Sequence, residues 1–300
     1  MHDGAIWFLC SLIPDDCHLI NMPLFSLRMK EQTVTSDRPW VMGIVNVTPD
    51  SFSDSGQFFN PQKALSRALA LVDDGADMID IGGESSRPGA AAVADDEELK
   101  RILPLTEALA QRSILVSVDT VKPQVMRAAI SAGAAMINDI NALCTPDALE
   151  AVAASQAAVC LMHMQGEPRT MQEAPHYENV VEDVIAFLKE RIDACVAAGI
   201  TRERIVLDPG FGFGKTVEHN LELMRNLPKL RTLGLPLLIG WSRKSTLGAL
   251  TGRAVDERLP ASLAAALAAA AQGAAIIRVH DVRETVDALT IWRAMTPETT

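Results

Sequence analysis

Basic side chains are in the minority in this sequence of 300 residues, which has 27 Lys and Arg against 38 Asp and Glu. The formal net charge of -11 argues against a surface that binds nucleic acid mainly through its phosphates. We therefore expect no nucleic-acid partner. An anionic ligand would need a local cluster of cationic side chains.

Cysteine is scarce, and no long apolar run occurs. The five cysteines are scattered without a C-x-x-C pair, which argues against a disulfide framework and against a zinc site. The apolar stretch at residues 6–13 follows no basic region and is interrupted by Pro14, so it fits neither a signal peptide nor a membrane span. We therefore expect a cytoplasmic protein without a membrane partner.

The first 36 residues lack a pattern that predicts an element of the fold. We expect residues 1–36 to be an extension that is disordered or not native, with Met22 and Met29 as alternative start sites. Deleting residues 1–28 should then leave activity and melting temperature nearly unchanged.

From residue 40 onward, short β-branched runs alternate with longer Ala/Leu-rich stretches. This alternation predicts βαβ units and a parallel sheet. The unit recurs eight times without a linker, which predicts an α/β protein with a single-domain (β/α)8 TIM barrel over residues 37–300. The expected strands are residues 41–47, 78–82, 114–119, 136–140, 158–162, 205–207, 237–239 and 275–279.

Polar side chains gather where these expected strands end. Barrel enzymes build their active sites on the loops at the C-terminal ends of the strands. The sequence therefore predicts an enzyme whose site is drawn from these ends: Asn46, residues 84–87, Asp119, Asn138, Asp139, His163, Asp208, residues 242–244, Arg278 and His280.

Four segments resemble the dihydropteroate synthases: GIVNVTPDSFSD at 43–54, GGESSRPGA at 82–90, DPGFGFGK at 208–215 and SRKS at 242–245. The likeness covers about residues 40–290, with its motifs in the family's order. The resemblance implies a transferase of folate biosynthesis. Such an enzyme condenses 6-hydroxymethyl-7,8-dihydropterin pyrophosphate with p-aminobenzoate and releases pyrophosphate. It also implies a homodimer and a target of sulfonamides.

The resemblance assigns the pterin to Asp119, Asn138 and Asp208, with Met162 and Phe213 packed against the ring. A carboxylate such as Asp208 offers two acceptors to the paired N–H donors of an aminopyrimidinone. Asp119 would also stabilise positive charge on the pterin as pyrophosphate leaves. The alternatives are a turn aspartate at Asp208 and helix caps at Asp119 and Asn138.

The resemblance assigns cations to the other end of the pterin substrate. Lys244 would lie over the pterin carbonyl near the second substrate. Arg278 and His280 alternate in the eighth strand, so they share a face that suits pyrophosphate. The alternative is a structural arginine with a hydrogen-bonded core histidine. Asn46 would hold Mg2+, which prefers oxygen ligands and is the expected cofactor.

The p-aminobenzoate pocket is expected on two loops. The resemblance gives its walls as Phe52, Ser86, Arg87 and Pro88, and its catalytic residues as Asp54, Arg87, Asp119 and Lys244. Residues 47–57 would form a lid over bound substrate. Two positions depart from the family pattern, because Ser55 replaces a glycine and Ser86 replaces a threonine. Ser55 would stiffen the lid.

Two features of the sequence are decoys. The run at 210–216 invites a phosphate-loop interpretation, but Pro209 and Lys215 stand where the nucleotide-binding patterns need glycine. His163 is expected to be a hydrogen-bonded core residue.

Two rival functions remain, a methyltetrahydrofolate-dependent methyltransferase of similar fold and a pterin-binding module without catalysis.

Overall fold

A computed structural model of the chain describes residues 25–48, 60–85, 93–168 and 170–296. Eight parallel strands pair in the order β8-β7-β6-β5-β4-β3-β10-β9, and a bridge between Leu207 and Leu237 joins the two ends of this order. The strands are β3 (Trp40–Asn46), β4 (Met78–Gly82), β5 (Val116–Asp119), β6 (Met136–Asp139), β7 (Ala158–Met162), β8 (Ile205–Asp208), β9 (Leu238–Ile239) and β10 (Ile276–Val279). The predicted TIM barrel is confirmed.

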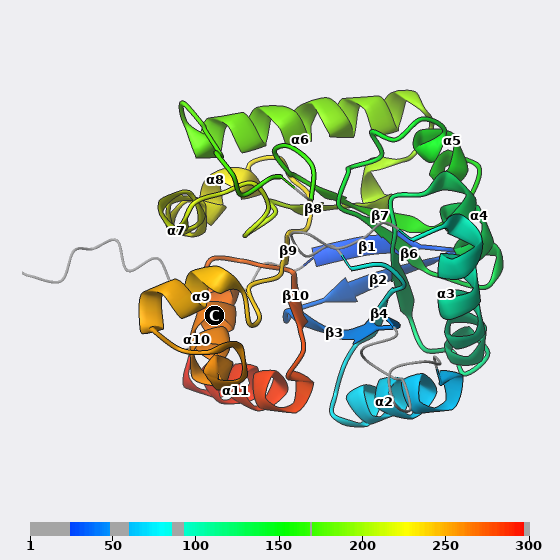
Figure 1. Cartoon of the computed structure of the whole chain (residues 1–300), viewed down its shortest axis with the longest axis horizontal. Coiled ribbons are helices and arrows are strands. Elements are labelled where there is room, and N and C mark those ends of the chain that lie inside the picture. The colour runs from blue at the N-terminus through cyan, green and yellow to red at the C-terminus, as the bar shows by residue number, and fades with distance from the viewer. Residues whose placement is uncertain (1–24, 49–59, 86–92, 169, 297–300) are drawn as a thin grey trace, which may run out of the picture.

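Helices surround the strands, as Figure 1 shows. The α-helices are α2 (Pro61–Asp73), α3 (Asp95–Ala110), α4 (Pro123–Ser131), α5 (Ala148–Ala153), α6 (Val180–Ala197), α7 (Val217–Arg225), α8 (Leu227–Arg231), α9 (Ser245–Thr251), α10 (Leu259–Ala271) and α11 (Val282–Met295). Short 3-10 turns occur at Arg202–Arg204 and Val255–Glu257. Among the described residues, no helix is long and apolar enough to cross a membrane.

Local sequence fixes where the helices begin and end. The Asn60 side chain accepts hydrogen bonds from the Gln62 and Lys63 amides at the start of α2, and Pro61 occupies the first turn. Gly75 and Gly133 follow α2 and α4 with φ angles of 100° and 104°, a region that favours glycine. Each glycine turns the chain back toward the next strand of the barrel.

The structure contradicts the expectation of disorder for residues 25–36. These residues form an antiparallel hairpin of β1 (Phe25–Met29) and β2 (Gln32–Ser36). Phe25, Leu27 and Met29 are buried, and they pack with the side chains at the N-terminal ends of the barrel strands, including Trp40, Met42, Met78, Met136, Val206 and Ile276. Residues 1–24 lie outside the described residues.

The hairpin covers this end of the barrel because the side chains that point inward there are apolar. Without it, a cluster that contains three barrel methionines and Trp40 would lose its cover. The alternation of buried and exposed residues along β1 follows the period of two for a strand with one buried face. The opposite end of the barrel is left to the polar side chains.

Candidate active site

Four side chains at the C-terminal end of the barrel form one hydrogen-bonded network. Arg278 on β10 donates from Nε to Asp80 Oδ2 at 2.6 Å and from Nη2 to Asp119 Oδ2 at 3.0 Å. Asn138 on β6 donates from Nδ2 to the same Asp80 oxygen at 3.3 Å. The structure therefore brings Asp119 and Asn138, which the sequence assigns to the pterin, together with Arg278, which the sequence assigns to pyrophosphate.

Asp80 is the member of this network that the sequence analysis missed. It lies in the middle of β4, is fully buried, and bonds both Arg278 and Asn138 through Oδ2. Its other oxygen, Oδ1, has no hydrogen-bond partner within the described part of the chain. The signal was present, since an aspartate inside the buried strand sequence MIDIG has no structural reason to be there.

Burial and charge shift the ionisation of Asp119 and Arg278 in the same network. Burial raises the pKa of Asp119 to about 7, while Arg278 opposes this shift and Asp80 adds to it. Burial acts to lower the pKa of Arg278, but Asp80 and Asp119 outweigh it and raise that pKa above its ordinary value. The guanidinium therefore stays charged and favours the carboxylate form of Asp119.

Asp208 ends β8 and faces the same end of the barrel. Its Oδ1 accepts a hydrogen bond from the Gly210 amide at 2.7 Å. Asp208 therefore stabilises the turn after β8, which is the alternative role considered above. Each carboxylate oxygen can accept two hydrogen bonds, so a ligand can still be received. Burial raises the pKa of Asp208, and the charge of Lys244 is the largest influence that opposes it.

Lys244 lies between two parts of the loop that follows β8. Its Nζ donates to the Phe211 carbonyl and stands 4.8 Å from the centre of the Phe213 ring. Burial lowers the pKa of Lys244 to about 8, while Asp208 acts to raise it. Lys244 and Phe213 thus meet beside Asp208, as expected for two walls of one pocket. Met162, at the end of β7, pairs in register with Asp208 and is buried.

His280 follows β10 and is held to the loop after β9. Its Nδ1 lies 3.0 Å from Ser242 Oγ, and its backbone amide donates to the same oxygen at 3.2 Å. Arg278 instead turns its guanidinium onto Asp80 and Asp119. The two side chains that the sequence joined in one pyrophosphate cluster therefore contact different partners in this structure.

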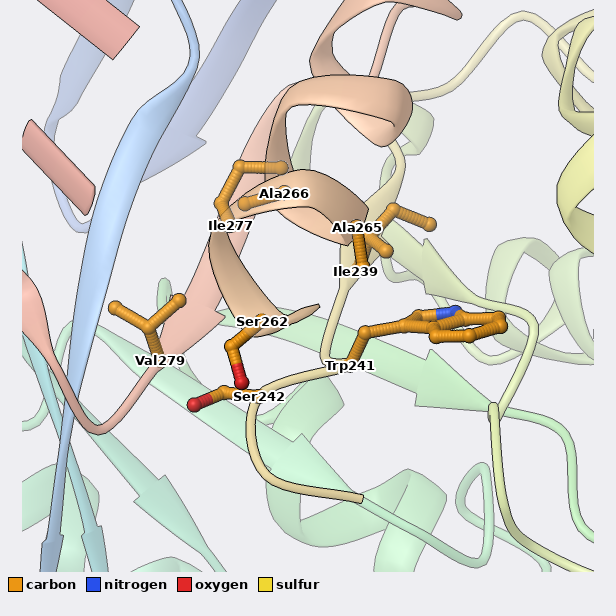
Figure 2. A pocket seen from close by; sticks show the side chains of 8 residues that line it. All are labelled: Ile239, Trp241, Ser242, Ser262, Ala265, Ala266, Ile277 and Val279. Carbon is orange, nitrogen blue, oxygen red and sulfur yellow. The ribbon is translucent and has the colours of Figure 1, made fainter. Parts of the chain in front are cut away.

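A small pocket lies behind the loop of Ser242 and is distinct from this cluster (Figure 2). It is lined mainly by apolar side chains of β9, β10 and α10. Both serine hydroxyls in its lining have hydrogen-bond partners. Ser242 Oγ bonds His280, and Ser262 Oγ accepts from the Arg243 amide at 3.0 Å. Trp241 also lines the pocket, and its indole Nε1 has no hydrogen-bond partner within the described part of the chain.

Asn46, the predicted magnesium ligand, ends β3 beside Asp119. A Cβ added to Gly82 would lie 3.4 Å from Asn46 Oδ1 and 3.9 Å from Asp119 Cβ, so glycine leaves room for both side chains. Among the described residues, no group of three or more His, Cys, Asp or Glu could hold a metal ion. An amide oxygen suits Mg2+ that takes its other ligands from water and substrate.

The expectation for His163 is confirmed. It is buried, its Nδ1 lies 2.9 Å from Lys215 Nζ, and its ring packs edge-on against Phe187. Burial lowers the pKa of His163 to about 3, so the ring is neutral. Lys215 points inward as well and is 2% exposed, which agrees with the rejection of a phosphate loop at 210–216.

Comparison with known proteins identifies the family. The model of the pterin binding enzymes matches residues 42–280. A dihydropteroate synthase of Haemophilus influenzae is 52% identical over 257 residues, which are 85% of this chain and 94% of that protein. The chain belongs to the dihydropteroate synthase family.

Solved dihydropteroate synthases share the fold. The enzyme of Xanthomonas albilineans with 4-aminobenzoic acid superposes with a TM-score of 0.85 at 51% identity, covering 91% of this chain and 100% of that one. The enzyme of Burkholderia cenocepacia complexed with 7,8-dihydropteroate gives a TM-score of 0.83 at 49% identity, covering 90% and 96%. These names agree with the resemblance and with neither rival function.

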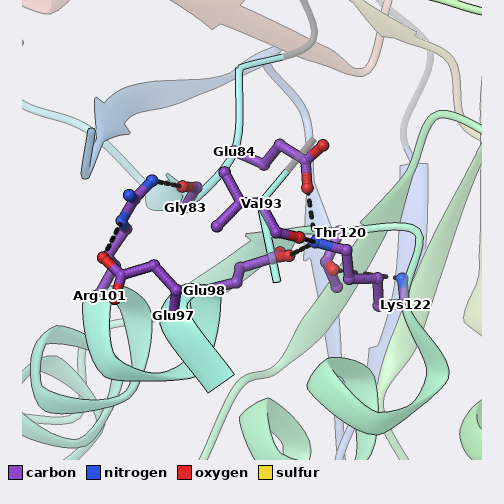
Figure 3. A network of polar contacts seen from close by, with 8 residues as sticks. All are labelled: Gly83, Glu84, Val93, Glu97, Glu98, Arg101, Thr120 and Lys122. Carbon is purple, nitrogen blue, oxygen red and sulfur yellow. Dashed lines mark hydrogen bonds and ion pairs between the residues drawn. The ribbon is translucent and has the colours of Figure 1, made fainter. Parts of the chain in front are cut away.

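Part of the site expected for a dihydropteroate synthase lies outside the described residues. This applies to Phe52, Asp54 and Ser55 in segment 49–59, and to Ser86, Arg87 and Pro88 in segment 86–92. Lys122 bonds residues on both sides of segment 86–92. Its Nζ donates to Glu84 Oε2 at 2.5 Å and to the Val93 carbonyl at 2.6 Å (Figure 3). Lys122 lies three residues after Asp119, so its bonds connect the loop after β4 to the loop that follows Asp119.

Proposed function

We propose that this protein forms 7,8-dihydropteroate by joining the amine of p-aminobenzoate to the methylene of 6-hydroxymethyl-7,8-dihydropterin pyrophosphate, with loss of pyrophosphate. One observation carries this most directly. Asp119, Asn138 and Asp208 lie in the last two positions of three strands of one barrel in a chain of this family, with Lys244 beside Asp208. Membership of the family supports the reaction, and the geometry supports a division of roles among the residues.

Asp208, Asn138 and Asp119 bind the pterin in this proposal. The Asp208 carboxylate accepts the paired N–H donors of the aminopyrimidinone edge, while Asn138 and Asp119 serve the remaining ring nitrogens. Met162 and Phe213 pack on the ring. Asp208 and Asn138 are buried, which strengthens their hydrogen bonds relative to the same bonds in water, and those of the Asp208 carboxylate are charge-assisted.

Charge development assigns the catalytic roles. As the bond to pyrophosphate breaks, positive charge grows on the pterin methylene, and the Asp119 carboxylate stabilises it. Arg278 favours the ionised form of Asp119. We assign the pyrophosphate leaving group to Arg278 and His280. Lys244 orients the pterin and the second substrate toward each other.

Magnesium fits this scheme through Asn46. Mg2+ prefers oxygen ligands and keeps several waters, so a single amide oxygen with pyrophosphate oxygens is a suitable set. When bound, Mg2+ would supply neutralisation of the leaving group's charge. Asn46 would hold it at the end of β3, beside Asp119.

The second substrate is assigned to the loops after β3 and β4. We assign p-aminobenzoate, and sulfonamides that share its aniline, to Phe52, Ser86, Arg87 and Pro88. Asp54 and Arg87 complete the proposed catalytic set with Asp119 and Lys244. A cytoplasmic location and a homodimer are proposed from the family resemblance.

Calorimetry tests the division of roles. The wild-type protein should bind 6-hydroxymethyl-7,8-dihydropterin alone, and should bind p-aminobenzoate only when pyrophosphate and Mg2+ are present. The Asn46→Ala variant should no longer bind p-aminobenzoate, even when pyrophosphate and Mg2+ are present. Full p-aminobenzoate affinity in Asn46→Ala would refute the magnesium assignment.

A further inference from the structure

Lys215 is a buried cation to which neither the sequence motifs nor the proposed reaction assigns a role. It follows the glycine-rich run after β8 and is 2% exposed. Its Nζ lies 2.9 Å from His163 Nδ1, and it donates to the carbonyls of Gly210 and Phe213, each at 3.0 Å. The His163 carbonyl is a further acceptor at 3.3 Å.

The three carbonyl partners are hydrogen-bond acceptors, which suits an ammonium. Three carbonyl oxygens and a neutral imidazole nitrogen surround Nζ, so the three N–H donors of an ammonium are shared among four acceptors. Within the described part of the chain, no carboxylate forms an ion pair with Lys215. A buried cation without a direct counter-ion is costly, and burial lowers the pKa of Lys215 to about 7.

The bonds of Lys215 set the shape of the loop that carries the pterin pocket. They draw the carbonyls of Gly210 and Phe213 toward the end of β7 at His163. The approach is so close that a Cβ on Gly210, which has a φ of 70°, would lie 1.8 Å from the His163 carbonyl oxygen. The same loop presents the Phe211 carbonyl and the Phe213 ring to Lys244.

The charge of Lys215 also acts on Asp208. Burial raises the pKa of Asp208, and Lys215 is one of the cations that oppose this shift, after Lys244 and Arg278. An ionised Asp208 is the form that accepts both N–H donors of a pterin edge. Lys215 itself bonds only protein atoms, so its effect on a ligand passes through other residues.

We propose that Lys215 is a positioning residue of the pterin pocket. Its ammonium holds the loop after β8 in the shape that sets Phe213 and Lys244 beside Asp208. This inference rests on the proposed function, because it takes the ligand of Asp208 to be a pterin.

The test compares Lys215→Met with Arg204→Met. Arg204 is also a buried cation that donates to backbone carbonyls, those of Ala157 and Val152, but it precedes β8 at the opposite end of the same strand. Both variants lose a buried cation and should lose stability. Only Lys215→Met should weaken 6-hydroxymethyl-7,8-dihydropterin in calorimetry, by about tenfold or more, the equivalent of one charge-assisted hydrogen bond.

Steady-state kinetics separate positioning from general destabilisation. In Lys215→Met, the KM for the pterin pyrophosphate should rise by a similar factor. The KM for p-aminobenzoate at saturating pterin pyrophosphate should stay unchanged. If Lys215→Met does not fold, Lys215→Gln keeps two donors without the charge, and its pterin affinity should still fall below that of the wild type.

Two results would overturn the inference. One is wild-type pterin affinity in folded Lys215→Met or Lys215→Gln, and the other is an equal loss of pterin affinity in Arg204→Met. The wild-type protein in the same assays tests the proposed function separately. A wild type that binds no pterin refutes the function, whereas an active wild type with an unaffected Lys215 variant refutes only this role.

Discussion

Asp208 combines a structural hydrogen bond with the capacity to bind a ligand. Its Oδ1 accepts a hydrogen bond from the Gly210 amide. Because Asp208 is buried, water cannot readily replace it as a hydrogen-bond partner of the ligand. Asp208→Ala should therefore abolish binding of free pterin in calorimetry, since each lost charge-assisted bond is worth about 1.5–3 kcal/mol. Melting temperature serves as the control for folding. Retained pterin affinity in folded Asp208→Ala would refute its assignment.

Arg278 is more closely tied to the pterin residues than its place in the sequence indicates. It bonds Asp80 and Asp119, so its removal leaves a buried and a partly buried carboxylate without their cation. Arg278→Ala should then impair pterin and pyrophosphate binding together, whereas an arginine that contacts pyrophosphate alone would spare the pterin.

The pH profile of kcat/KM reports this coupling. Asp119 has a pKa of about 7 and acts as a carboxylate, so wild-type kcat/KM should rise as the pH increases through about 7. Arg278 lowers that pKa, so Arg278→Ala should move the rise to higher pH. A rise that stays at the wild-type pH in an active Arg278→Ala variant would show that Arg278 does not control the ionisation of Asp119.

At the scale of elements, the hairpin of β1 and β2 is expected to stabilise the barrel. Leu27 is 0% exposed within the cluster at the N-terminal ends of the strands, so Leu27→Ala should lower the free energy of unfolding by about 2–5 kcal/mol. Ser26→Ala, at the exposed neighbouring position, should change it by less than about 0.5 kcal/mol. Urea denaturation of both variants measures the difference. Equal stabilities would mean that the hairpin does not pack on the barrel.

The loop between β4 and α3 depends on Lys122. Glu98 on α3 is 1% exposed and has Lys122 Nζ at 2.6 Å, so Lys122→Met leaves a buried carboxylate without its cation. Breaking such a pair costs about 3–5 kcal/mol. Adding Glu98→Gln should recover part of that loss, which a double-mutant cycle in urea would detect. Strict additivity of the two substitutions would contradict a direct pair.

The same variants test a link between Lys122 and the second substrate. Lys122 bonds both described ends of the loop that contains Ser86, Arg87 and Pro88. Under the proposed assignment, Lys122→Met should raise the KM for p-aminobenzoate more than that for the pterin pyrophosphate. Lys122→Arg should restore part of the difference.

The sequence predicted the barrel strands closely because each is an apolar run between helical stretches. The largest difference is at β5, which begins at Val116 and not at residue 114. The hairpin was missed because FSLRM and QTVTS are short, and their burial depends on barrel residues far away in the chain. The partners of Asp80 on β6 and β10 could not be predicted from local sequence, although an aspartate inside an apolar strand was itself a signal. The role of Lys215 was missed because its contact with His163 joins two loops that are far apart in the sequence.

At the scale of the whole molecule, the two ends of the barrel have opposite characters. The hairpin covers an apolar cluster at one end, while Asp80, Asp119, Asn138, Asp208 and Arg278 gather at the other. This arrangement separates stability from chemistry, as is usual in barrel enzymes. The proposed reaction requires both substrates at the polar end at the same time.

The most direct test of this account is a coupled assay of pyrophosphate release by the purified full-length protein with Mg2+. Pyrophosphate should be released only when 6-hydroxymethyl-7,8-dihydropterin pyrophosphate and p-aminobenzoate are both present, with one 7,8-dihydropteroate formed for each pyrophosphate. Release at the same rate with the pterin pyrophosphate alone would contradict it.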